Sequence, residues 1–344
     1  MKWPTSIVLL AAIAAPALAQ TDPSTSGAHI DNSVGLSDLL PTPEQPASDI
    51  ADSISSDVFA RRDDAYGAFQ RGYYLTALAL ALPRAEKADP AAQTLIAEIY
   101  AGGLGVAENV ARASSWYALA AKNGDRMAAF ELGLLYLDGS GVPKNQKRAA
   151  ELFKVAADKN YPPAQYNLAL LHIDGTAVPP SLTAAAQLMR AAANSGLAEA
   201  QYDYGNMLIE GAGVAPDLNE GTRQVGLAAR QGLAEAQVDY ATALYLGQGV
   251  TKDLHAAVGW YEQAASAGNP VAQNRLAKLL AVGEGVTLDL KQAAMWRALA
   301  RRQGLSDPLL DKLLVGISQK DLAAAEELAR FWPSTPPGAV KAAG

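Results

Sequence analysis

Apolar residues recur along the middle of the chain with the spacing of helix faces. Between residues 146 and 158, four of them stand at i, i+3, i+4 and i+7, which places them on one side of a helix. They are Ala149, Leu152, Phe153 and Ala156. A second helix is predicted over 163–173, after a break at Asn160. Because one such pair cannot bury its apolar side alone, we expect neighbouring pairs to cover it.

The same pattern repeats at a fixed interval of 36 residues. The phrase Gly-x-Gly-Val begins at residues 103, 139, 211, 247 and 283, and a weakened copy, Gly-Thr-Ala-Val, begins at Gly175. Six copies without a slip predict one elongated array of stacked supersecondary units rather than several globular domains. Glycine supplies the backbone freedom that a tight turn between two helices requires.

Each repeat holds the same residue types at fixed positions. A residue that can cap a helix with its side-chain oxygen precedes the first helix: Asn109, Asn145, Ser181, Asp217, Asp253 and Asp289. One position in each helix is alanine in every copy: Ala120, Ala156, Ala192, Ala228, Ala264 and Ala300 in the first, and Ala92, Ala128, Ala164, Ala200, Ala236 and Ala272 in the second. Glutamine follows the second alanine in five of six copies. A small residue, such as Gly133 or Gly205, recurs further along the second helix and lets a neighbouring helix approach closely.

Several of these positions together resemble the Sel1-like repeat, a relative of the tetratricopeptide repeat. The resemblance rests on Ala164-Gln165, Leu168-Ala169, Asp174-Gly175, Arg148-Ala149, Trp116-Tyr117 and Ala120-Ala121-Lys122-Asn123-Gly124. It covers residues 91–304. It implies an all-α fold, a right-handed α/α superhelical solenoid of helix-turn-helix repeats. It also implies a non-enzymatic adaptor or scaffold role in a bacterial envelope, secretion or signalling complex.

The first 19 residues have the pattern of a secretory signal peptide. Lys2 gives the positive start, 7–15 is a short apolar run, and Ala17-Leu18-Ala19 is a small-residue site, so we predict cleavage after Ala19. The alternative is a transmembrane anchor, but the run is shorter than the roughly 20 residues that cross a bilayer. Together with the resemblance, this pattern predicts a periplasmic protein without a transmembrane segment after cleavage.

Residues 20–60 are predicted to be a disordered acidic leader rich in Ser and Pro. The stretch 20–57 carries seven acidic residues and no Lys or Arg, and it cannot bury enough apolar surface to offset the entropy of ordering. Two alternatives stay open: its patch 34–40 is a docking motif, or the leader is the working part that the array only anchors. Residues 61–90 are predicted to form a degenerate N-terminal capping repeat, in which Pro83 breaks the helical pattern.

The period is lost after Gly304. Residues 305–332 are predicted to form C-terminal capping helices that cover the last repeat. The short first one runs over 308–315, and the last one, over 319–332, follows the cap Ser318. Its side chains Leu322, Leu328 and Trp332 are expected to turn inward. Residues 333–344 are expected to be a disordered tail.

Composition narrows the function classes. The formal net charge of -7, without a run of Lys or Arg, argues against a nucleic-acid partner. The chain has no cysteine, which excludes disulfides, thiol catalysis and cysteine metal sites. Its three histidines do not share a repeat, and no known catalytic motif is present, so we predict no enzyme activity and no catalytic, cofactor-binding or metal-binding residues. A cell-wall-associated enzyme or a peptidoglycan-binding protein is the alternative function.

We expect a protein or peptide partner to bind the concave face of a monomeric array. The resemblance to tetratricopeptide repeats implies that the second helix of each pair lines this face. The predicted partner-binding residues are Phe130, Asp138, Tyr166, Asp174, Tyr202, Glu210 and Tyr245. An aromatic row beside acids would suit a peptide that carries Lys or Arg. The alternative is that these side chains pack inside a tight superhelix.

Overall fold

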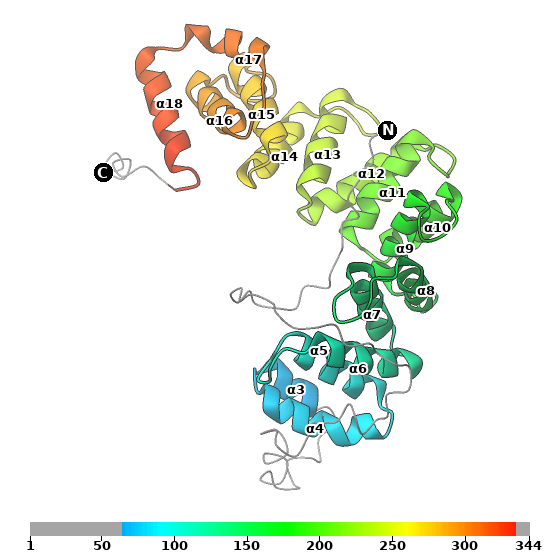
Figure 1. Cartoon of the computed structure of the whole chain (residues 1–344). Coiled ribbons are helices and arrows are strands. Elements are labelled where there is room, and N and C mark those ends of the chain that lie inside the picture. The colour runs from blue at the N-terminus through cyan, green and yellow to red at the C-terminus, as the bar shows by residue number, and fades with distance from the viewer. Residues whose placement is uncertain (1–63, 335–344) are drawn as a thin grey trace. The chain divides into compact units, whose positions relative to one another are not determined.

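The computed structural model describes residues 64–334, which form an all-helical chain (Figure 1). These residues contain sixteen α-helices, one 3-10 helix and no strand, which confirms the predicted all-α class. The predicted signal peptide and leader, and the tail from residue 335 on, lie outside them. The helices are α3 (Asp64–Gln70), α4 (Tyr74–Glu86), α5 (Pro90–Ala101), α6 (Val110–Lys122), α7 (Arg126–Asp138), α8 (Gln146–Ala157), α9 (Pro162–Asp174), α10 (Leu182–Asn194), α11 (Ala198–Glu210), α12 (Leu218–Arg230), α13 (Ala234–Leu246), α14 (Leu254–Ser266), α15 (Pro270–Val282), α16 (Leu290–Arg302), α17 (Pro308–Leu313) and α18 (Gln319–Phe331).

The chain divides into two compact units, and the boundary lies between Ala192 and Ala193. Within each unit, successive helices pack against one another in chain order around a core rich in alanine. The twelve alanines that recur in the repeats are all buried, with at most 2% of their surface exposed. An alanine at such a place fills the gap between two helices, and a larger side chain would overpack it.

The most extensive contacts join each second helix to the first helix that follows it, across the Gly-x-Gly-Val turn. This holds for α5 with α6, α7 with α8, α11 with α12, α13 with α14, and α15 with α16. The structural pair is thus offset by one helix from the unit expected from the sequence. The predicted small residues make the contact possible, because a Cβ added at Gly205 would meet the carbonyl oxygen of Gly221 at 2.8 Å.

Both glycines of the Gly-x-Gly-Val turn have a left-handed backbone, with φ of 83° at Gly139 and 68° at Gly141. The first glycine ends the second helix. The second lies against the start of an earlier first helix, since a Cβ added at Gly141 would meet the carbonyl carbon of Val110 at 2.7 Å. The same contact, with a residue 31 positions earlier, recurs for Gly249 with Leu218 and for Gly285 with Leu254.

All six predicted N-caps are formed. In each first helix the cap side chain accepts a hydrogen bond from the backbone N–H three residues on, at 2.9–3.1 Å. The backbone N–H of the same cap residue donates to the carbonyl oxygen nine residues earlier, at 2.7–3.0 Å. The two bonds close the turn and satisfy amides that the helix itself leaves unpaired.

The recurrent glutamine ties each second helix to the helix before it. Its side-chain N–H donates to the carbonyl oxygen eight residues earlier, which belongs to the end of the preceding helix. The five residues are Gln93, Gln165, Gln201, Gln237 and Gln273, all buried. Gln201 and Gln273 also accept a hydrogen bond from a glutamine 30 residues further along the chain. Helix α7 lacks this tie because its register position holds Ala129.

The two ends of the array differ in detail from the prediction. Helix α4 continues through Pro83 to Glu86, so the predicted break is wrong. Proline removes one backbone donor, and so close to the end of the helix this loss interrupts little. At the other end, α17 is followed by a 3-10 helix, η2 (Leu314–Gly316), and α18 begins after its predicted cap Ser318.

The buried face of helix α18 spans fewer residues than expected. Ala325 and Ala329 are buried, and the ring of Trp332 packs edge-on against that of Trp296 with centroids 4.8 Å apart. Leu322 is 41% exposed, so its predicted inward orientation is wrong. The buried side of the helix begins only at Ala325, and Leu322 lies before it.

Candidate functional site

Two of the predicted partner-binding aromatics are core residues. Phe130 is 0% exposed and Tyr166 is 5% exposed, so the expectation that they line an open face is wrong. The ring of Phe130 packs against Phe153 and Tyr161, with centroids 5.5 and 5.3 Å away. The Phe153 ring in turn lies against Gly133, where α7 and α8 approach closely. For Phe130 and Tyr166, the alternative of packing inside the array holds.

The three predicted acids are exposed, and each is the last residue of a second helix. They are Asp138, Asp174 and Glu210. This is an unfavourable place for an acid, because the helix dipole is negative there. Asp174 accepts a hydrogen bond from Thr176. The register mates further along the chain, Leu246 and Val282, are apolar and about half exposed, at 51% and 50%.

The two remaining predicted residues, Tyr202 and Tyr245, are half-buried tyrosines bonded to acids in unit 2. The Tyr202 hydroxyl donates to Asp239 at 2.7 Å, and burial together with this carboxylate raises the pKa of Tyr202. The Tyr245 hydroxyl donates to Glu284 at 2.9 Å, and this bond, with burial, raises the pKa of Tyr245.

A further set of polar residues occupies three repeat positions on successive helices. In unit 1 they are Glu98 on α5, Tyr117 on α6 and Glu131 on α7. The same positions, four repeats later in unit 2, hold Thr242 on α13, Tyr261 on α14 and Arg275 on α15. The charge at the third position therefore reverses from acidic to basic between the two units.

The unit 1 set is acidic and largely shielded from water. Burial, with the nearby Asp125 carboxylate, raises the pKa of Glu98 to about 7. Burial, with Glu98, raises the pKa of Glu131 to about 7 as well. The pKa of Tyr117 is raised by burial and by both glutamates, so its hydroxyl stays protonated. Near neutral pH this set holds a proton that water-exposed carboxyls would release.

In the unit 2 set, the hydroxyls of Thr242 and Tyr261 hold Arg275 in place. Its Nη1 donates to the Thr242 hydroxyl at 2.7 Å and to the Tyr261 hydroxyl at 3.1 Å. Thr242 gives its own proton to the Val238 carbonyl at 2.7 Å, so the 2.9 Å bond between the hydroxyls runs from Tyr261 to Thr242. Both oxygens are thus acceptors for the guanidinium. Among residues 64–334, no carboxylate forms an ion pair with Arg275.

The neighbouring cation, Lys278, does have a carboxylate partner. Its Nζ lies 2.6 Å from Asp307, which also accepts a hydrogen bond from the Asn274 amide at 2.6 Å. Burial alone would raise the pKa of Asp307, but the bonds from Lys278, Asn274 and the Leu310 backbone N–H lower it to about 2. Asp307 therefore stays ionised and balances the Lys278 charge.

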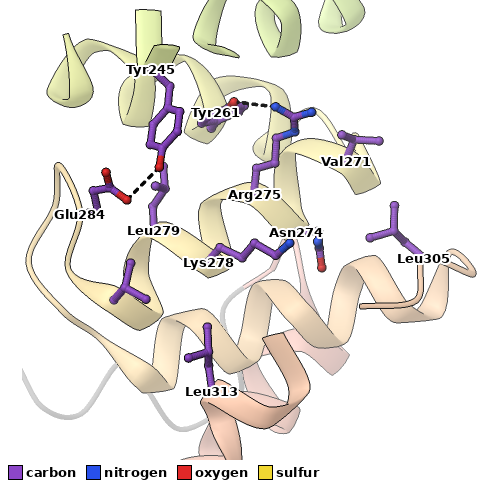
Figure 2. A pocket seen from close by; sticks show the side chains of 11 residues that line it. Tyr245, Tyr261, Val271, Asn274, Arg275, Lys278, Leu279, Glu284, Leu305 and Leu313 are labelled. Atoms are coloured by element: carbon purple, nitrogen blue, oxygen red, sulfur yellow. Dashed lines mark hydrogen bonds between the residues drawn. The ribbon is translucent and has the colours of Figure 1, made fainter. Parts of the chain in front are cut away.

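Asn274, Arg275 and Lys278 line a groove of about 430 Å³ in unit 2 (Figure 2). Its volume falls within the range of pockets that bind ligands. Arg275 and Lys278 rise from α15, and the bonded pair of Tyr245 and Glu284 lies at another side. The apolar part of the lining consists of Val271, Leu279, Val282, Leu305 and Leu313. Tyr245 is the only one of the seven predicted partner-binding residues in the lining of this groove.

The described part of the chain shows no cluster of three His, Asp or Glu side chains that could hold a metal ion. Within residues 64–334, no helix has both the length and the apolar character needed to span a bilayer.

The repeat matches a known family. The model of the Sel1 repeat matches six consecutive stretches, residues 90–125, 126–161, 162–197, 198–232, 234–269 and 270–305. The chain belongs to the Sel1 repeat family. Each Sel1 repeat begins at a second helix and includes the first helix that follows, which is the pairing found in the structure.

Solved structures of Sel1 repeat proteins resemble the chain. A Sel1 repeat protein from Oxalobacter formigenes is 29% identical with a TM-score of 0.62, over 70% of this chain and 98% of that one. The protein c5321, described as a protective antigen present in uropathogenic Escherichia coli strains displaying an SLR fold, is 26% identical with a TM-score of 0.64. The match covers 74% of this chain but 56% of c5321. No curated protein matches the chain. Sel1 repeats form a scaffold fold that often mediates protein interactions.

Neither the acidic residues of the unit 1 set nor the basic residues of the unit 2 groove were predicted from the sequence. Glu98, Glu131, Arg275 and Lys278 lie at only two register positions of the repeat. A comparison of the six copies at these positions reveals the signal, since the acids of the early copies are replaced by Arg and Lys in the last.

Proposed function

We propose that this protein is an exported, non-enzymatic scaffold of the bacterial envelope. As a monomer, it binds a protein or peptide partner through the second-helix side of its Sel1 repeats. The groove of unit 2 carries this proposal. It offers an arginine without a carboxylate partner in the described chain, beside exposed apolar side chains. A concave apolar site with a few fixed polar groups is typical of a recognition surface.

Site-specific crosslinking tests the binding role. A photoreactive amino acid is placed at Leu313 in the groove, or at Leu182 on α10 as a control with matched exposure, 41% against 42%. Cells that express each protein are irradiated, and crosslinked proteins are identified by mass spectrometry. We expect one dominant partner from Leu313 and none from Leu182. A Leu313 protein without a crosslinked partner, or the same proteins at both sites, would contradict the proposal.

The export proposal has its own test. Lys2, the apolar run over 7–15 and the site ending at Ala19 support a cleavable signal. We expect a C-terminally tagged protein, made in a Gram-negative host, to appear in the osmotic-shock fraction with Gln20 as its first residue. An intact N-terminus in the cytoplasmic fraction would overturn export while leaving the binding role untouched. Incubation with peptidoglycan fragments should give neither turnover nor binding.

A further inference from the structure

We infer that the groove of unit 2 binds an extended peptide segment in which an acidic side chain stands next to apolar ones. This inference rests on the proposed function and names its site and ligand class. The acidic side chain pairs with Arg275, and the apolar neighbours lie against α15 and α17. The predicted peptide is thus opposite in charge to the Lys- or Arg-bearing peptide that the acids Asp138, Asp174 and Glu210 suggested.

The charge of the ligand follows from how the groove's own charges are balanced. Lys278 is neutralised by Asp307 at 2.6 Å, whereas Glu284 keeps its negative charge and accepts a hydrogen bond from the Tyr245 hydroxyl at 2.9 Å. Arg275 is bonded only to neutral hydroxyls, at 2.7 and 3.1 Å. An arginine side chain pairs best with a carboxylate, because its planar donors match the two carboxylate oxygens. A carboxylate from a ligand would complete this site.

The position of Arg275 is prepared before any ligand arrives. Its two acceptors form a chain of hydrogen bonds that ends at the backbone of α13, and Tyr261 is itself buried at 2% exposure. A guanidinium that is already held in place loses little freedom when it binds a carboxylate. This arrangement favours a specific ligand contact over a mobile surface charge.

The apolar walls specify the neighbours of the acidic residue. Val271, Val282 and Leu313 line the groove and are 38%, 50% and 41% exposed. Single exposed apolar residues are ordinary, but here three line the same groove. Burial of such side chains under a ligand contributes roughly 25 cal/mol for each Å² of apolar surface removed from water.

Groove size favours a short extended segment as the occupant. A volume of about 430 Å³ accepts a few side chains. A stable face-to-face dimer would instead need to bury roughly 800 Å² of accessible surface on each partner. The chain's own residues 20–57 carry seven acids and no Lys or Arg, so they are a competing occupant that the experiment must distinguish.

The experiment begins with a bead library of random octapeptides, amidated at the C-terminus so that every carboxylate comes from a side chain. Full-length protein with a fluorescent label is used for selection, and the selected peptides are sequenced. The strongest is made again with fluorescein, and its affinity is measured by fluorescence anisotropy. We expect Asp or Glu beside Leu, Ile, Val or Phe to be enriched among the selected peptides.

Variants test the contacts one by one. Arg275→Gln should weaken binding at least tenfold, and Leu313→Glu should do so by removing an apolar contact and adding a repelling charge. Glu284→Gln should leave binding unchanged or tighten it. Arg223→Gln, an exposed charge in the same unit outside the groove, is the matched control and should bind like the wild type. Because Leu313 is exposed, its variant remains informative if Arg275→Gln unfolds, and thermal melting by circular dichroism reports this.

Three outcomes would overturn the inference. The first is a library without enriched acids, or without any selected peptide. The second is equal affinity of the wild type, Arg275→Gln and Leu313→Glu. The third is a marked gain in affinity after deletion of residues 20–60, which would make the chain's own segment the occupant. If Arg275→Gln binds the peptide like the wild type while Leu313 still crosslinks to a protein partner, the scaffold role stands and the acidic ligand class falls.

Discussion

At the scale of single residues, two glycines of the array stand in opposite settings. Gly141 has a left-handed φ of 68°, and a Cβ there would meet backbone atoms of α6 at 2.7 and 2.8 Å. Gly259 lies inside α14, and a Cβ there would meet nothing within 4 Å. The first glycine is required by both backbone and space, whereas the second only weakens its helix.

The first prediction compares alanine at these two glycines. Gly141→Ala should lower the free energy of unfolding by about 2–4 kcal/mol, from the left-handed backbone and the steric contact together. Gly259→Ala should raise it by about 0.5–1 kcal/mol, because alanine favours the helix. Urea unfolding followed by circular dichroism measures both. Equal effects of the two substitutions would contradict the close contact of Gly141 with the backbone of α6.

The partly buried glutamates of unit 1 give a second prediction at this scale. The pKa of Glu131 is raised to about 7 by burial and by Glu98, while in the unfolded chain it returns to about 4.3. Between these values the folded chain holds more protons than the unfolded one, so the free energy of unfolding falls as pH rises. Glu131→Gln should therefore stabilise the protein by on the order of 2 kcal/mol at pH 8 and leave it unchanged at pH 4.

The stabilities of the wild type and Glu131→Gln are compared by thermal unfolding between pH 4 and pH 8. Glu151→Gln is the control, since Glu151 is exposed and paired with Arg148 on the surface. A benefit of Glu131→Gln that is the same at pH 4 and pH 8 would show that its carboxyl does not titrate abnormally.

At the scale of the elements, the start of each first helix in the six repeats is fixed by a side-chain cap, and the turn before it by a backbone bond. Asp253 illustrates this, because its side chain accepts from the Ala256 N–H at 2.9 Å and its own N–H donates to Leu244 at 2.9 Å. The backbone bond survives any side-chain change except proline. The side-chain bond does not, so the two contributions are separable by mutation.

The third prediction concerns this cap. Asp253→Ala should lower the free energy of unfolding by about 0.5–2 kcal/mol. Asp253→Asn keeps the acceptor oxygen and should lower it by at most about 0.3 kcal/mol. Hydrogen exchange should speed up in the first turn of α14 for the alanine variant alone. Matching exchange in the two variants would mean that the cap bond contributes little.

Much of this element structure could be predicted from the sequence, because it depends on local chemistry. The 36-residue interval, the six caps and the small residues each follow from a requirement of one turn or one contact. The side of each second helix that is buried could not be predicted. In α7, apolar residues surround the helix, so its sequence does not show that Phe130 faces inward. The groove escaped prediction for a related reason, since its walls come from α13, α14, α15 and α17.

At the scale of the whole molecule, stability accumulates between neighbours. Within each unit, neighbouring Sel1 repeats pack on one another, and α18 covers the last repeat by packing on α16. The ring contact of Trp332 with Trp296 at 4.8 Å is part of this cover. In such an array, loss of a terminal cover weakens nearby repeats more than distant ones.

The fourth prediction tests this decay. Trp332→Ala should destabilise the protein by about 1–3 kcal/mol, since the side chain is only half-buried and a fully buried one would cost about 3–5. Amide exchange should rise in α15 and α16 and stay unchanged in α5 to α8. A uniform rise along the chain would instead indicate one cooperative unit.

The contact of the second turn glycine with a helix start 31 residues earlier, found at Gly141, Gly249 and Gly285, has a consequence for how such proteins change size. Because the helix start and the glycine belong to adjacent copies, a duplicated block of 36 residues would bring both halves of the fit with it. Gene duplication or excision can thus lengthen or shorten the array by whole modules without redesign of any interface. A slip by even one residue would move the glycine away from the helix start that it contacts, and the six copies keep the 36-residue interval without insertions.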